Sequence, residues 1–318
     1  MTKMKKISIC IPCYNEETNV VIAYHSLTRV MKKLKNYDYE FIFVDNGSFD
    51  KTKQLINKIA SKDKKVKGIF LSRNFGPESS GHAAYDHAIG DAIVGIPADL
   101  QEPSEMIPKF IKKWEQGYNV VLGVYKKTSD NLMMKSIRKL YYLIQKKISF
   151  IDIPADSTGF GLFDRKVLLA MRKLPEKYRF GRGILSWVGF KRAFISYERK
   201  KRLYGKSSYN FFDYLHHAER GLFGFSYFLL DLMVYGGFFL TFVSFLFITG
   251  YLYWVIVFGN PIQASIPLML AIFFFGGILL LAISILGKYI QVIVEETKAR
   301  PMYIVESTTN IKDGKISR

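Results

Sequence analysis

Two long runs without a charged residue constrain this chain more than any other feature. The first extends from Met233 to Phe258 and the second from Pro261 to Gly287. Each is long enough to cross the hydrocarbon core of a bilayer, which takes roughly 20 apolar residues in a helix. The alternative is a pair of helices buried in a soluble core, but the length of the runs argues against it. The sequence therefore predicts two membrane spans.

Basic residues flank this pair of runs on both outer sides, whereas the connecting segment GNPIQAS carries no charge. Lys and Arg accumulate on the cytoplasmic side of membrane spans. The N-terminal MTKMKK also leads directly into a short apolar run without the core of a signal peptide. We therefore expect a multi-pass protein of the inner (plasma) membrane, with the soluble domain and both termini in the cytoplasm. The flanking cations are Lys200, Lys201, Arg202, Lys206 and Arg220 before the runs, and Lys288, Lys298 and Arg300 after them.

The formal net charge of +19 over 318 residues exceeds what solubility requires. Such an excess attracts anions, and beside two membrane spans the expected partners are anionic lipids and phosphorylated substrates rather than nucleic acid. Cys10 and Cys13 have no second Cys or His pair nearby, so a zinc site is not indicated. Two reduced thiols in a buried strand are the simpler interpretation.

Short apolar runs alternate with amphipathic segments over residues 1–208. This alternation predicts an α/β domain with a mostly parallel sheet and helices on both faces. The strands are expected at Ile7–Ile11, Phe41–Val44, Gly68–Leu71, Ala92–Ile96 and Val120–Val124, and the helices at Glu17–Leu34, Lys51–Ser61 and Glu105–Gln116.

Polar clusters follow four of these predicted strands: YNEE, DNGS, RNFG and ADLQ. In open α/β sheets, ligands bind beyond the carboxyl ends of the strands. Asp99 and Gln101 follow one strand with one residue between them, and in an extended segment their side chains would point the same way. Two oxygen donors suit Mg²⁺ or Mn²⁺, which can also bind a diphosphate. The alternative is that ADLQ is an ordinary loop after a strand.

Two further segments combine apolar residues at helical spacing with positive charge. One spans 133–147, and the other is NFFDYLHHAERGLFGF, which leads into the first span. Basic amphipathic helices beside a span lie on anionic headgroups. For the first segment, packing against the soluble domain is an equal alternative. Paired interfacial helices and a long lipid substrate are also compatible with a homo-oligomer.

Several motifs in order resemble family 2 glycosyltransferases of the GT-A fold, and most closely the polyprenyl-phosphate type. That type includes bactoprenol glucosyltransferases and dolichol-phosphate mannose synthases. The motifs are IPCYNEE, FIFVDNGSFD, LSRNFG, ADLQEP, WEQGYNVVLG, FGRGILSWVGFKRAFISYERKKRLYGKSSY and the closing ARPMYIVES. The resemblance implies a GT-A catalytic domain over 1–208, a juxtamembrane amphipathic helix over 209–228, two spans with a short external loop over 229–290, and a cytoplasmic tail over 291–318.

The resemblance also implies an enzyme, a hexosyltransferase that moves a sugar from a nucleotide-sugar to polyprenyl phosphate on the cytoplasmic face, with inversion. A UDP-sugar and undecaprenyl phosphate are the expected substrates. Asp99 and Gln101 would hold the Mg²⁺ or Mn²⁺ ion, and with Arg199 and Arg202 they would form the catalytic set. The residues expected around the nucleotide and the phosphates are Pro12, Tyr14, Glu16, Asp45, Asn46, Arg73 and Ser207. A solvated charge run is the alternative for the two arginines.

The chain departs from the family pattern at several charged positions. Asn46 stands where the family has a second aspartate, and Pro97 stands where it has the first acid of Asp-x-Asp. Gly159 and Gly161 occupy the charged positions of Gly-Asp-Phe-Arg, with Asp156 as a nearby substitute. The arginine expected after VVLG is missing, with Lys126 and Lys127 the nearest cations.

These departures leave three alternatives open. The chain is an active transferase, a degenerate relative that binds nucleotide-sugar or lipid phosphate without turnover, or a transferase with another acceptor such as a growing polysaccharide. A phosphate monoester is already largely ionised near neutral pH, so an acceptor of this kind needs no general base. Two spans are too few to form a channel for polymer export. The first alternative is therefore favoured.

Overall fold

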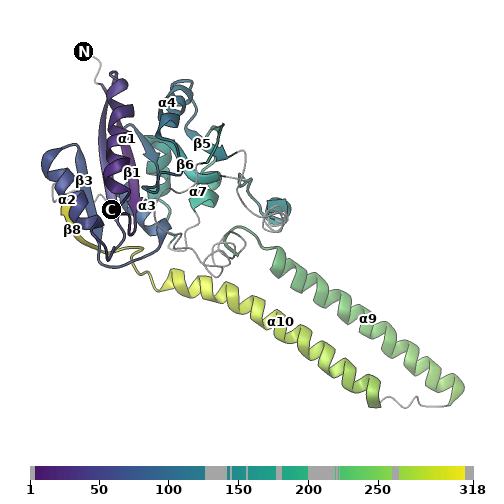
Figure 1. The fold of residues 1–318 in the computed structure, drawn as a ribbon. Coiled ribbons are helices and arrows are strands. Elements are labelled where there is room, and N and C mark those ends of the chain that lie inside the picture. The colour runs from purple at the N-terminus through teal and green to yellow at the C-terminus, as the bar shows by residue number, and fades with distance from the viewer. Residues whose placement is uncertain are drawn as a thin grey trace.

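The fold is described by a computed structural model that covers residues 4–125, 142–143, 145–154, 157–176, 181–199, 219, 221, 223–259 and 265–311. These residues form one α/β domain from which two long helices extend (Figure 1). The strands are β1 (Lys5–Cys13), β2 (Tyr37–Asp45), β3 (Val66–Leu71), β4 (Ala92–Gly95), β5 (Val120–Tyr125), β6 (Ser157–Asp164), β7 (Arg192–Tyr197) and β8 (Val305–Thr309). The helices are α1 (Val20–Lys33), α2 (Thr52–Lys62), α3 (Pro77–His87), η1 (Ser104–Met106), α4 (Ile107–Glu115), α6 (Arg165–Arg172), α7 (Gly181–Trp187), α9 (Phe228–Phe258) and α10 (Ser265–Thr297).

The strands form an eight-stranded sheet in the order β7-β5-β6-β4-β1-β2-β3-β8. The central block β4-β1-β2-β3 is parallel throughout, as are β5 and β7. β6 is antiparallel to both β4 and β5, and β8 is antiparallel to β3. The predicted mostly parallel α/β sheet is therefore confirmed. All five predicted strands form, and the three predicted helices correspond to α1, α2 and η1 with α4.

Helices cover both faces of the sheet, which explains the continuous apolar runs Ile9–Ile11, Phe41–Val44 and Ile69–Leu71 in the central strands. The side chains of α1, α2 and α4 pack on one face around Phe41, Phe43 and Phe70. On the other face, α3 and α6 pack against Ile42, Val44 and other residues of the same strands. A smaller cluster joins α6 and α7 to β5 and β6. The parallel block is thus held rigidly on both sides.

The two apolar runs form α9 and α10, which extend away from the domain as an antiparallel pair (Figure 1). Both contain stretches long and apolar enough to span a membrane, and none of the residues in those stretches is buried. Gly259 ends α9 in the left-handed conformation that favours glycine. Helices this long and apolar, with their side chains exposed, are typical of proteins associated with a membrane.

After α10 the chain returns to the sheet, which the domain boundaries predicted from the sequence did not include. Residues 291–318 were expected to form a separate tail, but Val305–Thr309 is β8 and pairs with β3 at the edge of the sheet. Tyr303 donates a hydrogen bond to Asp86 Oδ2 of α3 at 2.8 Å. The run VESTT is short and polar, so its pairing depends on a partner strand far away in the sequence. Much of this segment therefore belongs to the domain.

Both interfacial segments expected from the sequence lie largely outside the described residues. In the first, the structure describes 142–143 and 145–147, and in the second it describes 219, 221 and 223–225. At the domain end of α9, the described residues pack together: Phe150 stacks on Tyr227 with ring centroids 5.7 Å apart, and Tyr289 of α10 donates to the Ser226 carbonyl at 2.9 Å.

Candidate active site

The carboxyl ends of β4, β1, β2 and β3 lie at one edge of the sheet because these four strands are parallel neighbours. The polar clusters predicted to converge follow these ends, so the convergence is confirmed. Hydrogen bonds tie the first two loops together: the backbone N–H of Asn15 donates to Ser48 Oγ at 2.8 Å, and the N–H of Phe49 donates to Asn15 Oδ1 at 3.0 Å. Pro12 and Tyr14 lie half-buried beside this junction.

Asp45 is the last residue of β2 and is only 2% exposed. Its carboxylate accepts hydrogen bonds from the backbone N–H of Ser48, at 3.2 Å, and from the Ser48 hydroxyl. Burial raises the pKa of Asp45 above its ordinary value, although the bonds from Ser48 act in the opposite direction. A buried acid at a strand end is costly to maintain, which is typical of a binding site.

Asn46 connects the loop after β2 to the loop after β3. Its amide nitrogen donates to Asn74 Oδ1 at 2.9 Å and to the Gly76 carbonyl at 3.1 Å, and its amide oxygen accepts from the Phe75 N–H at 3.0 Å. An aspartate could not donate the first two of these bonds. The departure from the family pattern therefore has a structural reason, and Asn46 supports the site rather than facing into it.

Gly47 and Arg73 show how closely these two loops approach each other. A Cβ atom at Gly47 would lie 2.5 Å from the backbone carbonyl carbon of Arg73, and Gly47 has a φ of +72°. Only glycine suits this position. The exposed Arg73 guanidinium stacks on the Phe75 ring at 4.1 Å and donates to the Asn74 carbonyl at 3.0 Å. Arg73 thus lies at the rim of the site.

Glu16, expected near the nucleotide, is 6% exposed and accepts a hydrogen bond from Asn19 Nδ2 at 2.6 Å. Its backbone N–H donates to Thr52 Oγ1 at 2.8 Å. These contacts join the start of α1 to the start of α2. The structure therefore places Glu16 beneath the loops, where it supports their shape.

Asp99 lies half-buried in the loop after β4, beyond the last β4–β6 pair at Gly95. The N–H groups of Ile96 and Ala98 still donate to β1, at 3.0 and 3.4 Å. Pro97 lies between these two donors, and because alternate N–H groups point to opposite edges of a strand, its missing N–H costs no bond to β1. The proline therefore removes an acid without disturbing the position of Asp99.

Asp99 and Gln101 are not arranged as the spacing predicted. Leu100 has a φ of +60°, so the segment turns instead of running extended. Asp99 Oδ1 accepts a hydrogen bond from the backbone N–H of Gln101 at 3.2 Å. The prediction that both side chains point the same way is wrong, because a left-handed residue between them breaks the alternation of a strand.

Arg199 contacts the same loop through two of its residues. It follows the end of β7, and its Nη2 donates to Gln101 Oε1 at 2.8 Å. Its Nε lies 3.3 Å from Oε1 of Glu102, which is 3% exposed. The structure thus brings Asp99, Gln101 and Arg199 together. Sequence reasoning did not select Glu102, although it lies within the ADLQEP motif, because its burial depends on a partner almost a hundred residues away.

Gly159 and Gly161, which stand at the two charged positions of the Gly-Asp-Phe-Arg motif, differ in their surroundings. Gly159 of β6 has a φ of +83° and open space where a Cβ would lie. A Cβ at Gly161 would lie 2.4 Å from the Val121 carbonyl oxygen of the neighbouring strand, so this position has no room for an arginine. Arg202, Ser207, Asp156, Lys126 and Lys127 lie outside the described residues.

Among the described residues, no three His, Cys, Asp or Glu side chains form a group that could hold a metal ion. Asp99 nevertheless fits a divalent cation, because its carboxylate is half-buried and has no ion-pair partner in the described part of the chain. Gln101 fits less well, since its amide oxygen accepts from the Arg199 cation. One carboxylate is therefore the main protein ligand that these residues offer, and a bound diphosphate would have to supply others.

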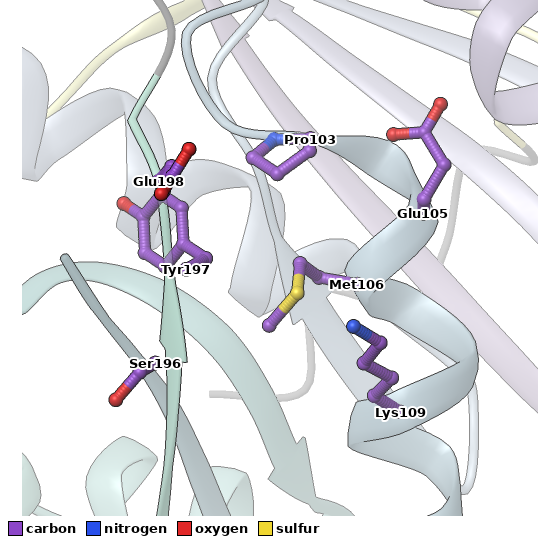
Figure 2. Close-up of a pocket in the computed structure, with 7 residues that line it drawn as sticks. All are labelled: Pro103, Glu105, Met106, Lys109, Ser196, Tyr197 and Glu198. Atoms are coloured by element: carbon purple, nitrogen blue, oxygen red, sulfur yellow. The ribbon is translucent and has the colours of Figure 1, made fainter. Parts of the chain in front are cut away.

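A recess of about 390 Å³ is lined by residues that follow Gln101 in the chain and by residues that precede Arg199. Figure 2 shows Ser196, Tyr197 and Glu198 at the end of β7 on one side, and Pro103, Met106 and Lys109 on the other. None of the strand-end residues Asp45, Asn46 and Asp99 lines it. The recess adjoins the site without containing the predicted nucleotide contacts.

Residues 8–171 match the sequence model of glycosyl transferase family 2. The chain is 37% identical over 303 residues to a bactoprenol glucosyl transferase of Shigella phage SfX, an alignment that covers 95% of this chain and 99% of that protein. It is also 37% identical over 319 residues to the uncharacterized glycosyltransferase YkcC of Bacillus subtilis, with 100% and 98% covered. The similarity to solved structures is more distant: glucosyl-3-phosphoglycerate synthase of Mycobacterium tuberculosis has 18% identity and a TM-score of 0.44, covering 63% of this chain and 72% of that one.

Proposed function

The chain belongs to glycosyl transferase family 2, and we propose that it transfers one sugar from a nucleoside-diphosphate sugar to the phosphate of a polyprenyl lipid. Relatives named bactoprenol glucosyl transferase, which match over nearly the whole chain, support a lipid phosphate as the acceptor. We further propose a UDP-sugar as the donor, undecaprenyl phosphate as the acceptor, and transfer on the cytoplasmic face.

The observation that carries this proposal is the meeting of Asp99, Gln101 and Arg199 beside four parallel strand ends. Asp45 and Asp99 supply carboxylates, and Arg199 supplies a guanidinium that can bind phosphate through several N–H groups. The same domain continues into two exposed apolar helices, which suits a lipid substrate. Arg202 and Ser207 are proposed to contact the phosphates, and Pro12, Tyr14, Asp45 and Arg73 to surround the nucleotide.

The proposed reaction is a single displacement with inversion at the anomeric carbon. An oxygen of the acceptor phosphate forms a bond to that carbon while the bond to the donor's diphosphate oxygen breaks, and the electron pair leaves with the nucleoside diphosphate. The acceptor is already an anion near neutral pH, so no proton has to be removed. The absence of an acid at Gly159 is compatible with this chemistry.

Asp99, with Gln101, is the proposed holder of Mg²⁺ or Mn²⁺, and such an ion would neutralise charge on the departing diphosphate. Arg199 contributes positive charge from the other side of the loop. Glu102 and Gln101 hold it there through contacts of 3.3 and 2.8 Å. Cations that are already in position when the reaction starts lower its activation barrier, because they need not reorganise as negative charge develops on the diphosphate.

The test is transfer by the purified full-length protein. It is incubated with undecaprenyl phosphate, Mn²⁺ or Mg²⁺ and each common labelled nucleotide-sugar, and the lipid fraction is analysed by chromatography and mass spectrometry. We expect a lipid-linked sugar with one donor. Asp99→Ala should lower the rate by on the order of a hundredfold or more, through loss of several kcal/mol of transition-state stabilisation. Nucleotide binding without product from any donor would identify a degenerate relative instead.

A further inference from the structure

Glu102 is a buried carboxylate that none of the proposed substrate contacts uses. Its side chain has an exposed fraction of 0%, and its Oε1 lies 3.3 Å from Arg199 Nε. The same oxygen accepts a hydrogen bond from the Tyr197 hydroxyl at 3.4 Å. A carboxylate that is removed from water needs a cation or donors close by, and here Arg199 supplies the charge.

Rigid packing holds this carboxylate and its partner strand in place. Tyr197, the last residue of β7, is 4% exposed and packs edge-on against Phe160 with ring centroids 5.4 Å apart. On the neighbouring strand, a Cβ at Gly123 would lie 2.9 Å from the Tyr197 ring, so only glycine leaves room for it. The η1 end of the Glu102 loop is tied to α1 by a 2.8 Å contact between the hydroxyls of Ser26 and Ser104.

The Arg199 guanidinium is held along one edge and accessible along another. Its Nε faces Glu102 and its Nη2 donates to Gln101, while the side chain is 36% exposed. A guanidinium has five N–H groups, and within the described part of the chain Nη1 makes no hydrogen bond. Several N–H groups are therefore left to bind phosphate.

Asp99 lies two residues before Gln101, and it is the second acid, besides Glu102, in the segment between β4 and η1. It has no ion-pair partner in the described residues. If Glu102 carried no charge, Arg199 would lose its contact with Oε1 and would be free to pair with Asp99 instead. That pairing would neutralise the carboxylate best suited to a divalent cation.

We propose that Glu102 is a positioning residue that holds the Arg199 guanidinium against Glu102 and Gln101 and thereby keeps Asp99 available for a divalent cation. The role rests on the proposed function, because it concerns the same metal and phosphate groups. It makes a prediction that general structural support does not make: neutralising Glu102 weakens metal binding, and removing Arg199 as well restores it.

The test measures Mn²⁺ binding in the presence of UDP, by electron paramagnetic resonance or calorimetry, on the full-length protein in detergent. Glu102→Gln should weaken binding by on the order of tenfold to a hundredfold, the range expected for a charge-assisted contact. The double variant Glu102→Gln with Arg199→Ala should regain most of the affinity. Glu105→Gln, the same change in charge three residues along the chain, is the matched control and should bind Mn²⁺ as the unaltered protein does.

Three outcomes would overturn the inference: unchanged Mn²⁺ binding in Glu102→Gln, no recovery in the double variant, or no Mn²⁺-dependent UDP binding in the unaltered protein. Tyr197→Phe is a milder variant, expected to weaken binding severalfold, and it serves if Glu102→Gln does not fold. Thermal unfolding of each variant identifies losses caused by misfolding. Because these measurements need no turnover, they stand apart from the sugar-transfer assay, whose failure would count against the proposed function alone.

Discussion

Asn46 illustrates how a substitution that removes charge can improve the support of a site. Its amide both donates and accepts, joining the loop after β2 to Asn74, Phe75 and Gly76. The side chain is 3% exposed, so an ionised group there would be deprived of water. In this chain Asn46 connects the two loops of the site, and Asp45 provides the carboxylate at the end of β2.

Asn46→Asp should therefore destabilise the protein. The variant loses two donated hydrogen bonds and places a negative charge beside two acceptors, which together cost about 2–4 kcal/mol. Thermal unfolding of the purified protein in detergent measures this cost. Asn36→Asp is the control, because Asn36 is exposed and makes no side-chain hydrogen bond in the described residues. Equal unfolding temperatures for the two variants would contradict the role assigned to Asn46.

Cys10 and Cys13 behave as the sequence predicted. Both are free and buried in β1, and burial raises the pKa of each thiol well above its ordinary value. A protonated, enclosed thiol is a poor nucleophile. These residues therefore belong to the core beneath the site.

The elements that sequence reasoning found are those whose signal is local. β1 to β5 are runs of Ile, Val and Phe buried on both faces, and α1, α2 and α4 have an apolar stripe. Three of the elements it missed, β6, β8 and α3, depend on distant partners. β6 is rich in glycine, β8 is short and polar, and α3 begins with small polar residues, so none has a strong pattern of its own. The same reason applies within the site, where the burial of the Glu102 carboxylate depends on Arg199 and not on its neighbours in the chain.

β8 links the second apolar helix to the loop that carries Arg73. Ser72 N–H donates to the Ile304 carbonyl at 3.0 Å, directly before Arg73. Further along, Asn310 adopts a φ of +58° and its amide donates to the carbonyls of Ala60 and Val66 at 2.7 and 2.8 Å. The returning strand is thus fastened at both ends, and it supports the rim of the site.

Asn310→Ala should release one end of β8. The variant loses two hydrogen bonds and places a less tolerant residue in the left-handed region, at a cost of about 1–3 kcal/mol. Hydrogen exchange of the β3 and β8 amides should become faster. Glu306→Ala is the control, since it removes only the exposed 2.7 Å ion pair with Lys53, worth roughly 0–1 kcal/mol. Unchanged exchange in Asn310→Ala would show that the amide bonds do not hold the strand.

Across the whole molecule, the return of β8 to the sheet constrains how the helix pair lies in a membrane. α9 leaves the domain and α10 leads back to it, so both domain-side ends of the pair lie near the same sheet (Figure 1). A chain that crossed the membrane once, or three times, could not pair β8 with β3 within one molecule. We predict from this arrangement that the helix pair crosses the membrane twice, with Gly259 at the end of α9 on the side away from the domain.

We predict that a reporter after Arg318 faces the cytoplasm, where Lys and Arg accumulate beside membrane spans, and that a reporter after Gly259 faces the other side. Green fluorescent protein fused after Arg318 should fluoresce, while alkaline phosphatase at that position should be inactive. Alkaline phosphatase fused after Gly259, which ends α9, should be active because it follows a single crossing. Phosphatase activity from the Arg318 fusion would reverse the orientation. Inactivity of the fusion after Gly259, with normal expression, would show that α9 does not cross. The reversed orientation would separate the domain from a cytoplasmic nucleotide-sugar, which the proposed reaction does not allow, whereas an α9 that does not cross would rule out the two crossings.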